Sequence, residues 1–434
     1  MTDITPEQAG SGRSRSTADL VRQSLARRNR KQKILQGFGI AAILFALSML
    51  VILVGSLIRT GYPAFTQTHV ELEVFVDPDG VNTERLSRGN YDDMLAASLG
   101  SYFPDVDMSD RAASREVMRI LSDGAELELR DQVVADPSLI GKTITIKLPA
   151  SDNYDQLNKG LIKRDTPEEN RRLDDAAIAH FDTLDAANVI STPLNTALIT
   201  SADSRFPELA GLKGAIVGSF WALLVCFVVS FPLGIGAAIY LEEFAPKNRL
   251  SDIIEININN LAAVPSVVFG LLALAVFLNW FGMPRSAPIV GGLTLALMTL
   301  PTIIIATRAA LKAVPPSIRE AALGVGASKQ QVVFHHVLPL AMPGILTGTI
   351  IGLAQALGET APLLLIGMNA FITSAPSGPL DSATALPTQI FIWADSPERG
   401  FVSRTSAAIL VLLTFLITMN AIAIYLRQKF ERKW

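Results

Sequence analysis

The chain has 434 residues, of which 50% are apolar and only 18% are charged. This composition is too apolar for a soluble protein of that length, so we expect a membrane protein. The single cysteine, Cys226, excludes a disulfide framework and a cysteine-based metal site. The net charge of −3 hides an asymmetry, because the amino-terminal segment is basic and the middle of the chain is acidic.

The amino-terminal residues 1–33 are rich in Ser, Gln and Arg and lack apolar periodicity, which predicts a flexible or weakly helical tail. The apolar run that follows, 34–58, is long enough to span a bilayer and too long for the core of a signal peptide, so we interpret it as an uncleaved first span. A cluster of basic residues precedes this run: Arg22, Arg27, Arg28, Arg30, Lys31 and Lys33. By the positive-inside rule, the cluster predicts a cytoplasmic amino terminus.

The next segment, 59–213, is polar and contains no stretch apolar enough to span a membrane. Between residues 61 and 210, 27 Asp and Glu residues oppose 14 Lys and Arg residues. Two stretches, 69–77 and 142–150, alternate apolar and polar residues as strands do. Two others, 114–134 and 167–184, have the pattern of helices. Its apolar content predicts a folded α/β domain rather than a disordered insert. An acidic surface repels anions, so we expect it to dock a partner or serve a structural role.

Five further apolar runs predict spans two to six: 214–241, 254–278, 289–310, 341–368 and 405–426. Eight Lys and Arg residues precede the first span and four lie in the carboxyl-terminal tail, whereas Arg285, Arg399 and Arg404 fall in the short outer loops. Six crossings with both termini in the cytoplasm agree with this distribution. We therefore expect a permease-like core over 214–434.

A polar, helix-forming segment, 319–339, lies between the fourth and fifth spans and reads REAALGVGASKQQVVFHHVLP. Good helix formers open it, whereas Gly324 and Gly326 break a helix, so we expect a short helix, a glycine turn and a second helix. We expect the second helix to end at Pro339.

The small side chains of Ala321 and Ala322 leave room for another protein to approach this segment closely. The carboxylate of Glu320 is placed to brace the first helical turn or to pair with a partner's cation. The alternative is an ordinary solvated helical hairpin that joins two spans.

Glu359, between Gly358 and Thr360, falls near the middle of the fifth predicted span. An ionised carboxylate at that depth is costly, so it should face the bundle interior, be protonated or be paired. Either Glu359 belongs to a translocation pathway or it is a structural residue that forms a hydrogen bond between helices. The hydroxyls of Thr360 and Ser266 either donate to a bound oxyanion or satisfy a local carbonyl.

The sequence contains no G-x-x-x-x-G-K-[ST] motif, so the chain does not bind ATP in the usual way and needs a partner for energy. His335 and His336 are neighbours on a predicted helix and point in different directions, which argues against a shared metal ion. We therefore expect a protein that is not an enzyme and that has no cofactor, no metal and no nucleic-acid partner.

The polar segment fits the pattern EAA, three residues, Gly, nine residues, an aliphatic residue, one residue, Leu-Pro, except that His336 occupies the aliphatic position. The residues that fill it are Glu320, Ala321, Ala322, Gly326, Leu338 and Pro339. This pattern resembles the cytoplasmic coupling motif of ABC-importer permease subunits. The resemblance implies that a loop over 311–340 places two helices in a cleft of an ATP-binding subunit.

Four runs together resemble the PstA-type permeases of phosphate ABC importers: VPSVVFGL at 264–271, VPPSIREAALGVGAS at 314–328, GETAPLL at 358–364 and LPTQIFIWADSP at 386–397. The resemblance covers the first span and about 213 to the end. It implies an all-α polytopic membrane protein with six transmembrane helices of the ABC-importer permease fold and an inserted soluble α/β extracytoplasmic domain. It also implies that Glu359, Thr360 and Ser266 line the translocation path.

The resemblance further implies the permease subunit of an ATP-driven phosphate importer in the bacterial inner (plasma) membrane. Its implied partners are an ATP-binding subunit dimer, a second, PstC-like permease subunit and an extracytoplasmic phosphate-binding protein. A permease for another oxyanion, sulfate or molybdate, is a close alternative. A membrane receptor with an outer sensor domain is a more distant one, because no kinase, methyl-accepting or coiled-coil output module follows the second span.

Overall fold

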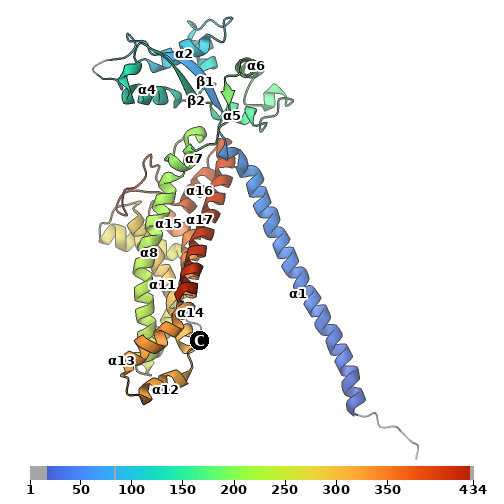
Figure 1. Cartoon of the computed structure of the whole chain (residues 1–434), viewed down its shortest axis with the longest axis vertical. Coiled ribbons are helices and arrows are strands. Elements are labelled where there is room, and N and C mark those ends of the chain that lie inside the picture. The colour runs from blue at the N-terminus through green and yellow to red at the C-terminus, as the bar shows by residue number, and fades with distance from the viewer. Residues whose placement is uncertain (1–16, 83–84, 431–434) are drawn as a thin grey trace, which may run out of the picture. The chain divides into compact units, whose positions relative to one another are not determined.

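The computed structural model describes residues 17–82 and 85–430 (Figure 1). The chain divides into two compact units, Met1–Leu57 and Ile58–Trp434. The expectation of a flexible tail concerns 1–33, of which 1–16 lie outside the described residues. The last four residues of the basic carboxyl-terminal tail lie outside them as well.

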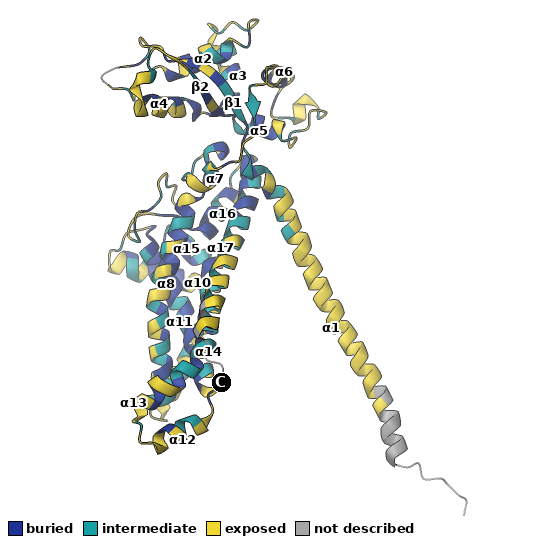
Figure 2. Cartoon of the chain, viewed as in Figure 1, coloured by how far each residue is buried: buried dark blue, intermediate teal, exposed yellow. Residues whose placement is uncertain are grey.

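The described part of the first unit is one helix, α1 (Thr17–Gly61), whose last residues belong to the second unit. Within it, the apolar stretch is long enough to cross a membrane, which confirms a continuous helix over the predicted span 34–58. Most apolar side chains of the stretch 34–58 are exposed (Figure 2). Residues 17–33 continue the same helix.

A small antiparallel sheet organises the polar domain, with strand order β2-β1-β3. Its strands are β1 (His69–Phe75), β2 (Thr143–Pro149) and β3 (Ile190–Ser191). Val70, Leu72 and Val74 alternate with more exposed residues along β1 and are fully buried, as expected of a sheet with one covered face. Both predicted strands are therefore confirmed. The third strand has only two residues, too few to leave an alternating pattern in the sequence.

Helices pack on this sheet around one continuous apolar core. They are α2 (Tyr91–Gly100), α3 (Arg111–Met118), α4 (Ala125–Ala135), α5 (Asp152–Asn158) and α6 (Asp175–Ala186). The short helix α7 (Ala197–Thr200) instead contacts α8 (Lys213–Ile239). The single helix predicted over 114–134 is wrong, because the chain turns at Ser122 and Gly124 to begin α4. The helix predicted over 167–184 is wrong at its start, because Asp174 caps α6 and only a 3₁₀ turn, Glu168–Asn170, precedes it.

After the α/β domain, the described part of the second unit contains four long apolar helices, with shorter elements between them (Figure 1). They are α8 (Lys213–Ile239), α11 (Pro288–Lys312), α14 (Leu338–Gly358) and α17 (Gly400–Phe430), with α16 (Leu386–Ala394) packed on α17. Small residues let these helices approach closely. A Cβ atom on Gly292 of α11 would lie 2.6 Å from the Ala222 carbonyl oxygen of α8, and one on Gly348 of α14 would overlap Ala306 of α11. Such contacts are typical of helix packing in membranes.

The third predicted span is wrong as a single helix. Amphipathic α9 (Arg249–Ala262) ends before Pro265, and α10 (Ser266–Ala273) begins after it and continues as a π-helical segment, Leu274–Trp280. The two parts meet at 100°. Proline lacks an amide donor and keeps the residue before it out of the helical region, which explains the break. The described residues thus contain five helices able to cross a membrane, and the bent pair makes a sixth candidate.

Candidate functional site

The polar segment between α11 and α14 folds as two helices around a glycine turn. The first, α12 (Pro316–Gly324), ends in a Schellman motif in which the amides of Gly326 and Ala327 donate to the carbonyls of Leu323 (2.9 Å) and Ala322 (3.1 Å). Gly326 has φ of +89°, a conformation that glycine adopts at little cost. The predicted order of helix, glycine turn and helix is confirmed.

The second helix begins at α13 (Lys329–Gln331) and is capped reciprocally by Ser328 and Gln331. It does not end at Pro339 as predicted. Instead it passes through a π-helical turn, Val332–Val337, directly into α14, and the whole helical stretch spans Lys329–Gly358. Because a π-helical turn shifts the hydrogen-bond ladder by one residue, the missing amide of the proline is tolerated just after it.

The six residues that fill the coupling pattern divide between surface and interior. Glu320 and Ala321 are exposed, Ala322 is buried, and Leu338 and Pro339 are half-buried in the second helix. Beside them, two large apolar side chains are exposed: Leu323, near the end of α12, is 54% exposed, and Val325, in the turn, is 87% exposed. Apolar residues this exposed on a turn outside the spans indicate a surface that another protein covers.

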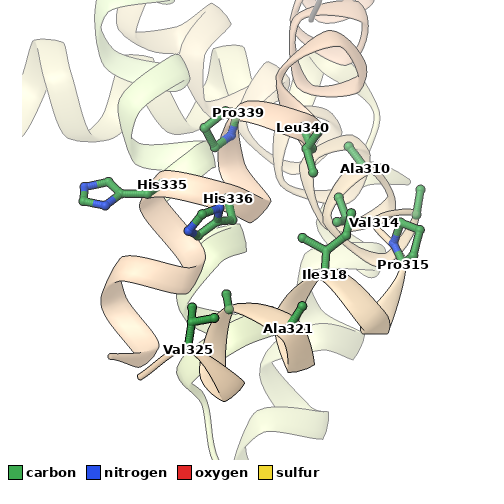
Figure 3. Close-up of a pocket in the computed structure, with 12 residues that line it drawn as sticks. Ala310, Val314, Pro315, Ile318, Ala321, Val325, His335, His336, Pro339 and Leu340 are labelled. Atoms are coloured by element: carbon green, nitrogen blue, oxygen red, sulfur yellow. The ribbon is translucent and has the colours of Figure 1, made fainter. Parts of the chain in front are cut away.

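A hollow of about 1000 Å³ opens between α12 and the start of α14 (Figure 3). Apolar residues line most of it, among them Ile318, Ala321 and Leu340. His335 and His336 also border it, and their rings point in different directions (Figure 3). Within residues 17–82 and 85–430, no group of three or more His, Cys, Asp or Glu side chains is placed to hold a metal ion.

Ion pairs connect this loop to the nearby ends of the neighbouring helices. Arg319 of α12 pairs with Glu243 at 2.8 Å, in the π-helical turn η5 (Tyr240–Phe244) that ends α8. The preceding Glu242 pairs with Arg308 and Lys312 of α11. These contacts were not predicted from the sequence, although opposite charges near the ends of adjacent apolar runs were a signal for them.

The residues predicted to line the path lie at two breaks in the helices. Glu359 ends α14 in an extended conformation, ψ 121°, and Thr360 directly precedes the short helix α15 (Ala361–Leu365). Ser266 is the first residue of α10, directly after the other break. The fifth predicted span, 341–368, is therefore wrong as one helix, because Gly358 and Pro362 flank the point where its hydrogen bonding stops.

The structure brings these two motifs together. A Cβ atom on Gly270 of α10 would lie 2.8 Å from the Cα atom of Pro362 in α15, so the backbones of the two helices are in close contact. Glu359, Thr360 and Ser266 are all half-buried. Broken helices inside a membrane protein are tolerated where the freed backbone groups face protein or a hydrated cavity, and transporters use such breaks at substrate sites.

Two family models match separate parts of the chain. Residues 230–434 match the family described as "Binding-protein-dependent transport system inner membrane component". Residues 22–168 match a separate "Domain of unknown function (DUF3333)", which includes most of α1 and much of the α/β domain.

Relatives of known name are transport permeases. The chain is 34% identical to the phosphate transport system permease protein PstA of Yersinia pestis over 214 residues, 49% of this chain and 71% of that protein. It is 32% identical to PstA 1 of Mycobacterium tuberculosis, covering 50% of this chain and 70% of that protein. It is also 28% identical to the probable ABC transporter permease protein YqgI of Bacillus subtilis, covering 52% of this chain and 82% of that protein.

Among solved structures, an inward-facing MetNI methionine ABC transporter is similar with a TM-score of 0.40 and 17% identity, covering 51% of this chain and 95% of that one. The family assignment rests on the sequence relatives, two of which exceed 30% identity over at least 70% of their own length. The chain belongs to the PstA family of binding-protein-dependent transport system permeases.

Proposed function

We propose that the chain is the membrane permease subunit of an ATP-driven phosphate importer and forms half of its translocation pathway. The observation that carries this proposal is the 34% identity to a phosphate permease over 71% of that protein. The subunit itself performs no chemistry on phosphate or ATP. Its role is to bind partners and to change conformation.

The exposed loop is the contact with the ATP-binding subunits. Glu320 and Ala321 lie on the surface of α12, and the exposed Leu323 and Val325 extend that surface into the glycine turn. An apolar patch with a carboxylate at its edge fits a cleft that buries the patch and offers a cation at the rim. A dimer of ATP-binding subunits that closes on ATP then moves α12.

The breaks at Glu359–Thr360 and at Pro265–Ser266 line the path. The first amides of a helix have no partner within that helix, so the start of α10 supplies donors suited to an oxyanion, and the hydroxyls of Ser266 and Thr360 add two more. Because Glu359 is negative when ionised, a cation that balances phosphate comes from another span or from a second, PstC-like permease subunit.

The α/β domain, 59–213, lies on the outer side of the bacterial inner membrane, and both termini lie in the cytoplasm. The basic residues that precede the first span and follow the last support this orientation. An extracytoplasmic phosphate-binding protein delivers phosphate to this face. Alternating access then opens the pair of permease subunits toward the cell interior.

Charge reversal at Glu320 tests the coupling role. We expect Glu320→Lys to reduce ATP-coupled phosphate uptake by about tenfold or more, because a reversed charge in a docked surface both loses a pair and repels the partner cation. Uptake is measured in cells that lack their own importers and that express the chain with its partner subunits. The amount of protein in the membrane is measured in parallel and should not change, because Glu320 is exposed.

The matched control is Glu169→Lys, the same reversal at an exposed carboxylate of the α/β domain. It should leave uptake unchanged. Normal uptake in Glu320→Lys would remove the coupling assignment.

A further inference from the structure

Two adjacent glutamates at the inner end of α8 divide their contacts between two neighbouring elements. Glu242 pairs with Arg308 at 3.4 Å and with Lys312 at 3.6 Å, both on α11. Glu243 pairs with Arg319 of α12. Both glutamates lie in the π-helical turn η5, a local widening of the helix that often occurs at functional positions.

Arg319 is the side chain that joins three elements at this point. Its Nη2 atom donates to the Glu243 carboxylate at 2.8 Å and to the Leu311 carbonyl at 2.9 Å, and its Nη1 atom donates to the Val314 carbonyl at 2.7 Å. Leu311 lies in the last turn of α11 and Val314 is the second residue after that helix, so Arg319 holds the end of α11 and the linker together. The planar guanidinium, with donors at fixed angles, suits such a three-way contact better than a lysine ammonium.

The contact is sheltered rather than fully solvated. The Arg319 side chain is 24% exposed and that of Glu243 is 10% exposed. A partly buried charge pair with additional hydrogen bonds is screened less by water than an exposed one, so it resists separation. By contrast, Glu320, the next residue along, is exposed. Neighbouring residues of α12 thus face different ways, one toward the partner surface and one toward the spans.

The chain connection between α11 and α12 is short and consists of Ala313, Val314 and Pro315. Ala322 of α12 also packs into one apolar cluster with Ile239 of α8 and Leu311 of α11. Such contacts are non-directional, whereas the contact of Arg319 with Glu243 and with two carbonyls fixes how α12 sits against α8 and the end of α11. The pairs from Glu242 then bind α8 to α11, and Arg308 extends the set to Glu255 of α9 at 2.8 Å.

We propose that Arg319 is a positioning residue that transmits movement of the coupling helix α12 to α8 and α11. The inference rests on the proposed function, since it concerns how ATP-driven motion reaches the spans. Without this contact, α12 still docks and the ATP-binding subunits still hydrolyse ATP, but hydrolysis no longer drives movement of α8 and α11.

The test compares two rates in the complete transporter reconstituted in liposomes with its binding protein: phosphate uptake and ATP hydrolysis. For Arg319→Lys and for Glu243→Gln we expect the rate of ATP hydrolysis to stay close to that of the wild type. The amount of phosphate moved per ATP hydrolysed should fall on the order of tenfold, a factor typical of the coupling between two linked sites. Because the two residues act as one contact, the double variant should lose little more than the worse single variant.

Arg427→Gln is the matched control. Arg427 is a half-buried arginine of α17 that donates to Thr347 of α14 at 3.1 Å. It should leave the ratio of uptake to hydrolysis unchanged. Thermal unfolding of each purified variant checks that it is folded.

A parallel fall of hydrolysis and uptake with an unchanged ratio would show that Arg319 only stabilises the loop, and would overturn the inference. Additive losses in the double variant would overturn it too. Failure of the proposed function looks different, because the wild type itself would then move no phosphate. If the wild type moves another anion, the same ratio measured with that anion still tests Arg319.

Discussion

Buried charges link the α/β domain to the last span, and Arg404 lies at their centre. It is 4% exposed on α17 and donates to the Ala210 carbonyl at 2.9 Å and to the Gln67 side-chain oxygen at 3.0 Å. The sequence predicted Arg404 in an outer loop, whereas α17 begins at Gly400, five residues before the predicted start of the span at 405, and includes it. Gln67 and Ala210 lie on the two connections of the domain, so one side chain holds both.

Acidic groups surround this arginine. Asp155 accepts from Lys159 at 2.6 Å and from the Thr68 amide at 2.8 Å, and Glu208 accepts from the Ser122 hydroxyl at 2.7 Å. Burial raises the pKa of Glu208 above its ordinary value of 4.5, against a smaller lowering by the Ser122 hydrogen bond. Burial likewise raises the pKa of Asp152.

The raised pKa of Glu208 predicts how stability changes with pH. A carboxyl that binds its proton more tightly in the folded state favours folding below its unfolded pKa, and this contribution fades as pH rises through the folded value. Acidification from about pH 7.5 to about pH 5 should therefore raise the Tm through this group, and Glu208→Gln should show a smaller rise. The measurement is thermal unfolding of the purified chain at both pH values.

Glu169→Gln serves as the control, because Glu169 is an exposed carboxylate of the same domain. It should keep the wild-type pH dependence. An equal rise in the Tm of the Glu208→Gln variant and of the wild type would contradict the assignment.

At the scale of elements, the two broken helices define the candidate pathway. α10 and α15 each begin directly after a break, and Gly270 allows their backbones to touch. The contact leaves no space for a side chain at this position, because a Cβ atom would lie 2.8 Å from both the Pro362 backbone and the Leu365 side chain.

Gly270→Ala should separate the two broken segments. We expect it to destabilise the protein by about 1–3 kcal/mol, since the clash involves backbone and exceeds the gain in helix propensity from alanine. Phosphate uptake should fall as well, because the residues of the path lie beside this contact. Thermal unfolding and uptake measure the two effects. Gly236→Ala in α8 is the control, because nothing lies within 4 Å of its Cβ position, and a stable, fully active Gly270→Ala would contradict the close contact.

Much of this element structure follows from local sequence signals. Gly326 can adopt the left-handed conformation of a turn that ends a helix, and the residues before it favour a helix. The helix α12 and the turn after it could therefore be predicted from the sequence. Apolar runs located the long helices because hydropathy determines which segments can cross a bilayer.

The breaks could be predicted only in part. Pro265 signalled an interruption, but the 100° angle depends on the packing of α10 against α15, which no local pattern encodes. Gly358 and Pro362 lie beside the point where α14 ends, and both residues are signals for a break. Hydropathy, however, stays apolar through this region, so it predicted one continuous span over 341–368. The pair between Arg319 and Glu243 joins residues far apart in the chain, so the sequence placed each charge without indicating its partner.

At the scale of the whole molecule, the second unit carries an acidic α/β domain that is attached firmly to the permease helices. Besides Arg404, the Trp393 indole of α16 donates to Asp203 at 3.0 Å, and the Gly400 amide donates to Asp152 at 3.2 Å. Buried apolar side chains from both parts, among them Leu198, Leu212 and Phe401, pack into one cluster. The α/β domain and the starts of α16 and α17 therefore share one packed interface.

Phosphate import by this chain is tested most directly by uptake of radiolabelled phosphate into cells lacking their own importers. The wild-type chain and Glu359→Gln are each expressed with the partner subunits, and sulfate is added in excess as the competing anion. Wild-type cells should accumulate phosphate at a rate that sulfate does not change. The Glu359→Gln variant should lose that uptake, because we propose that the Glu359 carboxylate, at the break after α14, lines the path. Suppression of wild-type uptake by sulfate would contradict the account and assign the chain to another oxyanion, whereas selective uptake by the variant would make Glu359 a structural residue.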